Sequence, residues 1–270
     1  MKSRFLFLLL VSFVLTVNSA IAQPSAVKAP FDIGETLTYD AKISKIIQGI
    51  SVAELTFTVG NGAENDNYLI TAEARSKGTL IKLFRYSFLQ KIDSVVRRSD
   101  LSALRTAKHD VQKERIRNSE AVFDYGDRRV TYTETDPNEP MRPPRMIASD
   151  LNGDTYDLVS GIYYLRTLPL AVGKTFDVTV SDSGLVYKVP VRVTGRERLK
   201  TEIGRVWCFK VEPEVFGDGR MIQREGSMII WITDDARRIP VRSQVKSSFG
   251  KLEIKLKSVG TSGAPTQKTE

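Results

Sequence analysis

The densest group of charged side chains lies in the stretch WITDDARRIPVR at residues 231–242. Asp234, Asp235, Arg237 and Arg238 fall within five positions of one another. Two carboxylates and two guanidinium groups this close could form a reactive cluster or contact a ligand. However, apolar alternation flanks them, and Asp side chains bond nearby backbone N–H groups in turns, which predicts a hairpin tip. Exposed charge pairs at such a tip contribute only ~0.2–1 kcal/mol each to the stability of the fold. We interpret these four residues as structural.

Other residue types that support catalysis or metal binding are scarce. His109 is the one histidine of the chain, so sites rich in imidazole cannot be built, and a Ser-His-Asp triad would have to use it. It lies in the polar segment AKHDVQKER, and the chain has no G-x-S-x-G motif, P-loop or dinucleotide fingerprint. Cys208, the one cysteine, lies in VWCFKV and is expected to be a small buried hydrophobe. We predict no catalytic residue, no metal site and no cofactor.

One stretch resembles part of a calcium-binding loop. Asp150, Asn152 and Asp154 match its first, third and fifth ligand positions. The match then fails, because Thr155 stands where glycine is required and Gly161 where a bidentate glutamate is required. We interpret the stretch as a turn that leads into a capped helix.

The N-terminal residues indicate export. Lys2 and Arg4 precede an apolar run at 5–15, and a small-residue cleavage pattern ends near Ala22–Gln23, as in a secretory signal peptide. We expect a periplasmic protein, with no transmembrane segment after cleavage because no later apolar run reaches about 20 residues. Export excludes nucleic acid as a partner. The formal charge of +8 could favour anionic lipid head groups or acidic glycans, or belong to an ordinary solvated surface.

The elements that must position any site are mostly strands. Apolar and polar residues alternate at 188–193 and 251–257 and in many similar segments separated by turn residues. This pattern predicts an all-β fold, an antiparallel meander forming a curved sheet or barrel-like sandwich. The segment 157–168 has helical spacing, with Asp157 as N-cap and Pro169 as the stop signal, and should pack as one helix against the sheet.

These patterns divide the chain into four parts. We expect a signal peptide at 1–22, a flexible N-terminal segment at 23–30, a single β domain at 31–259 and a disordered tail at 260–270. Within the β domain, two sheet halves would be joined through a Pro-rich loop at 136–150 and the helix at 157–168.

Several stretches resemble an exported bacterial family called domain of unknown function 3108. They are PFDIGETLTYDAKI at 30–43, YDLVSGIYYLRTLPLAVGKTF at 156–176, GRERLKTEIGRVWCFKVEP at 195–213, and WITDDARRIPVR with the following FGKLEIKL. The resemblance implies an all-β periplasmic domain with a curved sheet or barrel, and no known reaction or catalytic residue. More loosely, such barrels look like envelope carriers of lipids or lipoproteins, which is an analogy of fold alone.

Three functions stay open on this basis. The first is a carrier that binds an apolar or amphipathic ligand between the sheet and the helix, with Tyr163, Tyr164, Arg166 and Trp231 as candidate contacts and Arg166 meeting an anionic head group. The second is an interaction module that binds another envelope protein through a strand edge or the Pro-rich loop. The third is a polysaccharide hydrolase or lyase, for which the sequence selects no pair of carboxylates.

Overall fold

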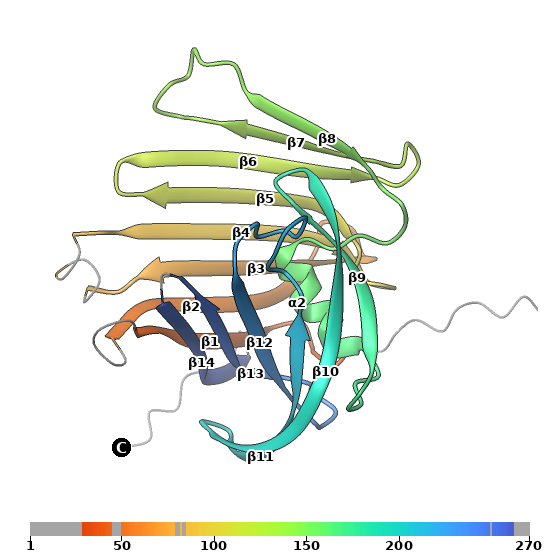
Figure 1. Cartoon of the computed structure of the whole chain (residues 1–270). Helices are drawn as coiled ribbons and strands as arrows, with labels where there is room; N and C mark the ends of the chain where they lie inside the picture. The colour runs from red at the N-terminus through yellow and green to blue at the C-terminus, as the bar shows by residue number, and fades with distance from the viewer. Residues whose placement is uncertain (1–28, 45–49, 79–81, 83–84, 249, 262–270) are drawn as a thin grey trace, which may run out of the picture.

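A computed structural model describes residues 29–44, 50–78, 82, 85–248 and 250–261. The predicted signal peptide at 1–22 lies outside the described residues. In the described part, fourteen strands form one antiparallel sheet (Figure 1). The strands are β1 (Glu35–Ser44), β2 (Ile50–Asn61), β3 (Asn67–Ser76), β4 (Phe88–Arg97), β5 (Ala103–Gln112), β6 (Arg115–Asp124), β7 (Arg129–Thr135), β8 (Arg145–Asp150), β9 (Thr175–Asp182), β10 (Leu185–Thr201), β11 (Gly204–Pro213), β12 (Gly226–Thr233), β13 (Pro240–Ser247) and β14 (Gly250–Thr261).

The sheet consists of two consecutive meanders. Its strand order is β8-β7-β6-β5-β4-β3-β2-β1-β14-β13-β12-β11-β10-β9, so β1 pairs with β14 and joins the two halves by hydrogen bonds. The connection between β8 and β9 contains helix α2 (Leu158–Thr167). The prediction of an all-β antiparallel fold with a helix against the sheet is confirmed.

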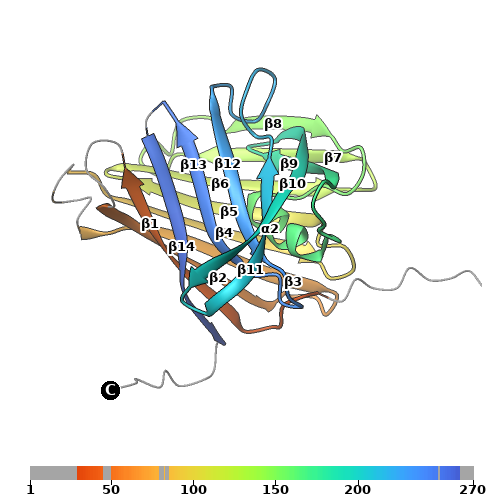
Figure 2. The same cartoon turned by 60° about the horizontal axis from the view of Figure 1, so that its bottom comes forward.

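The sheet curls so that its two ends approach each other, with α2 between them (Figures 1 and 2). The tip of the β9–β10 hairpin packs on β7 and β8. Gly184 in this tip has φ +80°, and a Cβ atom there would lie 2.6 Å from the Cβ of Tyr132 and 3.1 Å from that of Ile147. Glycine is therefore required both for the backbone conformation and for the close approach.

Helix α2 is fixed at its N-terminal end by a buried carboxylate. Asp157 accepts hydrogen bonds from the backbone N–H groups of Val159 (2.8 Å) and Ser160 (2.7 Å) and from the hydroxyls of Ser94 and Thr106 on the sheet. The predicted N-cap thus also ties the helix to β4 and β5. The buried side of α2 joins one apolar core that contains residues of both sheet halves.

Three predicted boundaries are wrong. The Pro-rich loop predicted at 136–150 ends earlier, because Arg145–Asp150 form β8 on the otherwise unpaired edge of β7, past the last proline. The predicted flexible segment at 23–30 is folded at its end, where Ala29 packs on the core and the carbonyl of Pro30 accepts a hydrogen bond from Arg166. The tail predicted at 260–270 begins inside β14, and its remainder lies outside the described residues.

Candidate functional site

A cavity lies between α2 and the sheet. Its volume is about 110 Å³, and nearly all of its exposed wall is apolar. The helix contributes Ile162, Tyr163 and Arg166. The sheet contributes Leu37 and Tyr39 from β1, Leu55 and Phe57 from β2, Met228 and Ile230 from β12, Pro240 and Ser243 from β13, and Ile254 from β14. The two sheet halves and the helix therefore all build the wall.

Strand pairing explains why these side chains meet. Leu37 pairs with Phe57, and Tyr39 pairs with Leu55, across β1 and β2. Residues directly opposite in an antiparallel pair project from the same face. Because apolar residues alternate along each strand, their side chains form an apolar patch on the face of the sheet that α2 covers.

The hydroxyl of Tyr39 at the cavity wall donates to the carbonyl of Pro240 at 2.9 Å, but three other polar groups there lack partners. The hydroxyl of Tyr163, the hydroxyl of Ser243 and Nε of Arg166 are buried, and none has a hydrogen-bond partner. Burial raises the pKa of the Tyr163 hydroxyl, which therefore stays protonated and can donate a hydrogen bond. Buried polar groups without partners are uncommon in folded proteins, because each costs about 1–3 kcal/mol.

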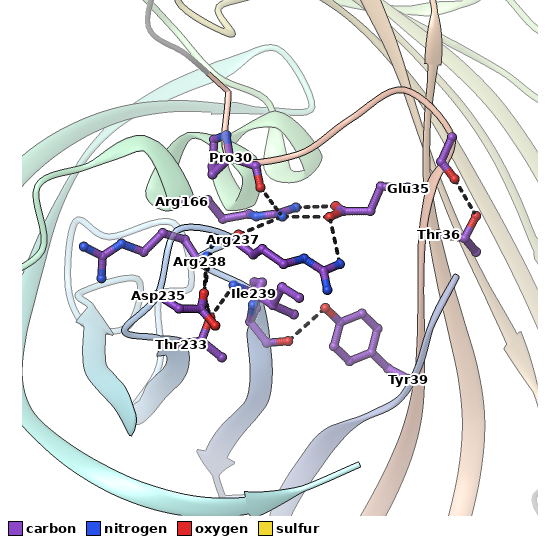
Figure 3. A network of polar contacts seen from close by, with 12 residues as sticks. Pro30, Glu35, Thr36, Tyr39, Arg166, Thr233, Asp235, Arg237, Arg238 and Ile239 are labelled. Atoms are coloured by element: carbon purple, nitrogen blue, oxygen red, sulfur yellow. Dashed lines mark hydrogen bonds and ion pairs between the residues drawn. The ribbon is translucent and has the colours of Figure 1, made fainter. Parts of the chain in front are cut away.

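A buried ion pair closes one side of the site (Figure 3). The terminal nitrogens of Arg166 donate to both carboxylate oxygens of Glu35, at 2.6 and 3.0 Å. One of them also donates to the carbonyls of Pro30 (3.2 Å) and Arg237 (3.0 Å). The guanidinium carbon lies 5.0 Å from the ring centre of Tyr163, as in a cation–π contact. These contacts engage both terminal nitrogens, whereas Nε of Arg166 has no partner.

The four charged residues Asp234, Asp235, Arg237 and Arg238 lie in the turn between β12 and β13 (Figure 3). One carboxylate oxygen of Asp235 accepts hydrogen bonds from the hydroxyl of Thr233 (2.8 Å) and from the backbone N–H groups of Arg237 (3.0 Å) and Arg238 (3.1 Å). Asp234 lies 2.7 Å from Arg196 and 3.2 Å from Arg238 in ion pairs. The turn supports the site through the carbonyl of Arg237, which binds Arg166.

Two other candidate ligand contacts lie elsewhere. Tyr164 stacks on Tyr156, with ring centres 4.0 Å apart, and does not line the cavity. Trp231 does not line the cavity and is buried in a cluster that also contains the wall residues Leu37 and Tyr39. Its indole nitrogen donates to Glu197 at 2.5 Å, and Arg242 lies over its ring. Its neighbour Ile230 lines the cavity, and successive strand residues project from opposite faces.

Sequence reasoning missed Glu35 and Ser243. Glu35 had a usable signal, because it continues the alternation of Leu37, Tyr39 and Ala41, all of which are buried on β1. A carboxylate in register with an apolar face requires a cationic partner. Ser243 had no such signal, since its strand mixes polar and apolar residues.

The residues considered for metal binding or catalysis do not line this cavity. The described residues contain no group of three or more His, Cys, Asp or Glu side chains that could hold a metal ion. His109 is exposed, with Nδ1 2.6 Å from the side-chain oxygen of Asn118. Cys208 is buried, which raises the pKa of its thiol to about 12. No helix in this part of the chain has the length and apolar character needed to cross a membrane.

Comparisons with known proteins concern the fold and the family. A β-barrel-like protein of domain of unknown function DUF1849 from Brucella abortus has a TM-score of 0.59 and 13% identity, covering 85% of this chain and 98% of that chain. Two matches have lower TM-scores. A protein with a YmcC-like fold from Bacteroides fragilis has a TM-score of 0.32 at 10% identity, over 86% of this chain and 98% of that one. The hypothetical protein CT021 from Chlamydia trachomatis has a TM-score of 0.34 at 8% identity, over 87% of this chain and 90% of that chain.

A search of the curated proteins found no match. The family described as "Protein of unknown function (DUF3108)" matches residues 37–257, which include every strand from β2 to β13 and helix α2. The match confirms the resemblance inferred from the sequence. The chain belongs to the DUF3108 family.

Proposed function

We propose that this protein binds an apolar or amphipathic molecule of the bacterial cell envelope in the cavity beneath α2, and that it works in the periplasm. The observation that carries the proposal is the combination of an apolar wall with three buried polar groups that have no partner. Ligand sites in proteins typically join an apolar lining to a few polar groups that orient the ligand. The signal-peptide pattern at 1–22 supports the location.

The size of the cavity limits what it can hold by itself. A dry apolar cavity of about 150 Å³ can bind benzene, so 110 Å³ suits the end of a hydrocarbon chain and not a whole lipid. The surroundings of the cavity are apolar as well. Leu55 and Ile254 belong both to the cavity wall and to a neighbouring cluster that includes the half-buried Ile43, Phe88 and Leu252.

Energetics favour an occupied cavity. At ~24 cal/mol per Å³, an empty cavity of this volume costs about 2–3 kcal/mol of stability. The unpartnered hydroxyls and guanidinium nitrogen add to that cost. A ligand that fills the space removes the cost of the empty cavity, so ligand binding should raise the melting temperature.

A cavity-filling variant tests the proposal. Ser243→Leu replaces an unpartnered hydroxyl with a bulky apolar group that occupies the cavity. Ser227→Leu on β12 is the matched control, because Ser227 is exposed and precedes the cavity residue Met228, so that its side chain projects from the opposite face. Binding is measured with a fluorescent fatty-acid probe, and folding is checked by circular dichroism.

The expected result is saturable probe binding by the wild type and by Ser227→Leu, with binding lost in a folded Ser243→Leu variant. Undiminished binding by the folded Ser243→Leu protein would show that the probe sits elsewhere, and absence of binding by the wild type would contradict the proposal.

A second candidate function is protein–protein interaction through the edge of β8. Among the described strands, β8 pairs only with β7, and its side chain Met146 is 68% exposed. Met141, in the Pro-rich segment before it, is 93% exposed. An open strand edge can accept a strand of another protein. Photo-crosslinking from position 146 in intact cells tests this function. The function requires that one specific partner is crosslinked and that this crosslink is lost when the edge is blocked by Ala148→Pro.

A further inference from the structure

A single row of side chains crosses the sheet and leads away from the cavity. Strand pairing joins Phe57 to Ala72, Ala72 to Ile92, and Ile92 to Lys108. Directly paired residues share a face, so the row begins at the cavity wall, which includes Phe57, and ends at a lysine. Three steps between neighbouring strands at about 4.8 Å each make the row about 14 Å long.

The row lies on the same face as α2. Thr106 and Lys108 are two positions apart in β5, and Thr106 donates to the helix cap Asp157 at 2.6 Å. Lys108 therefore projects toward the interior. All four side chains of the row are half-buried, so a ligand can reach them. On α2, Leu158 and Ile162 lie one turn apart and face the two ends of this path.

Lys108 ends the row in a polar environment. It lines a small cavity of about 40 Å³ beside the N-terminus of α2, together with hydroxyl groups. These are Thr106, Ser119, Ser181 and Ser183. Lys108 forms no ion pair with any described carboxylate, although Asp182 lines the same cavity and Asp110 follows two positions later on the same face. The other carboxylate there, Asp157, already accepts four hydrogen bonds.

We infer that the ligand is an amphiphile with an acidic head group, a carboxylate or phosphate, held by Lys108, while its hydrocarbon chain follows the row Ile92–Ala72–Phe57 into the cavity beneath α2. This inference rests on the proposed function and adds the class of ligand and its orientation. Ala72, in the middle of the path, has a small side chain. The cationic contact is Lys108 rather than Arg166, whose terminal nitrogens are bound to Glu35 and two carbonyls.

Two probes of equal chain length separate the head group from the chain. Dodecanoate carries a carboxylate and dodecanol does not. Isothermal titration calorimetry at neutral pH measures the Kd of each probe for four proteins: the wild type, Lys108→Gln, Asp182→Asn and Lys91→Gln. Lys91 lies on β4 next to Ile92, is exposed and projects from the outer face, so that Lys91→Gln removes the same charge from the opposite side of the sheet.

The wild type is expected to bind dodecanoate more tightly than dodecanol. Lys108→Gln should raise the Kd of dodecanoate about tenfold, as expected for a hydrogen bond to a charged group, and leave the Kd of dodecanol unchanged. Asp182→Asn should lower the Kd of dodecanoate severalfold by removing a repelling carboxylate, and Lys91→Gln should change neither value.

Two negative results have different meanings. Equal dodecanoate affinity in the wild type and Lys108→Gln would overturn the assignment of the head group while the proposed function stands. Failure of the wild type to bind either probe would overturn both.

Discussion

The ion pair between Glu35 and Arg166 provides the sharpest test of how the site is held together. The side chain of Arg166 is fully buried, and that of Glu35 is 5% exposed. They connect β1 with α2 across 131 positions of sequence. Replacement of Glu35 by Met leaves a buried guanidinium ion with only carbonyl partners, because the pairing carboxylate is gone. Removing one partner of a buried pair costs about 3–5 kcal/mol of unfolding free energy.

The reciprocal change should cost less. In Arg166→Met the carboxylate of Glu35 keeps a possible partner in Arg237, whose guanidinium nitrogen lies 3.9 Å away and whose side chain is 54% exposed and free to adjust. We expect Arg166→Met to lower the unfolding free energy by about 2 kcal/mol. The double variant replaces both charges by apolar groups and should lose less than the sum of the two single changes, with a coupling of about 3 kcal/mol.

Urea denaturation, followed by tryptophan fluorescence, measures the unfolding free energy of the wild type and the three variants. The fluorescence reports on the second sheet half, because Trp207 and Trp231 both lie there. A loss below about 1 kcal/mol in Glu35→Met, or strict additivity in the double variant, would refute the view that this pair fixes the helix over the cavity. The exposed pair between Lys91 and Asp93 serves as the control cycle and should show a coupling below about 1 kcal/mol.

Three further predictions follow from single groups. Asp157→Ala removes the helix cap and leaves two sheet hydroxyls without an acceptor, so it should cost about 3 kcal/mol in urea denaturation, and a loss under 1 kcal/mol would count against the cap's role. Burial would raise the pKa of Asp100, but hydrogen bonds from Ser102 and Arg97 outweigh it and hold that pKa below its usual value. Its stabilising contribution is therefore present above pH ~4 and is lost at lower pH, and Asp100→Asn should flatten the acid-side fall of the unfolding free energy. Cys208 should resist a thiol reagent in the folded protein and react in urea, because burial raises the pKa of its thiol to about 12; fast labelling of the native protein would contradict this.

The regular parts of the fold could be predicted from sequence because local patterns determine them. Alternation in β10, with Val189, Val191 and Val193 buried, indicates a half-buried strand by itself. The cap at Asp157 likewise identifies the start of α2 from its residue type and position. The strand β8 could not be predicted in this way, because its short, largely exposed sequence becomes a strand only when β7 offers an edge.

The candidate site could be predicted only in part because its residues come from five strands and a helix. Tyr163 and Arg166 were recognisable on the helix, but which way each faces depends on the rotation of α2 against the sheet. The separation of Trp231 from the cavity depends on the side of β12 from which it projects, which alternation alone leaves undetermined when both faces are apolar. The row that ends at Lys108 depends on the register of four strands, which no local pattern specifies.

Native mass spectrometry of the protein purified without detergent, followed by organic extraction, tests most directly whether the cavity beneath α2 carries a ligand. A bound mass that extracts as an acidic amphiphile, and that is missing from a folded Ser243→Leu variant, is the predicted result. A protein that keeps its ligand-free mass after incubation with a total envelope lipid extract would contradict the proposed function.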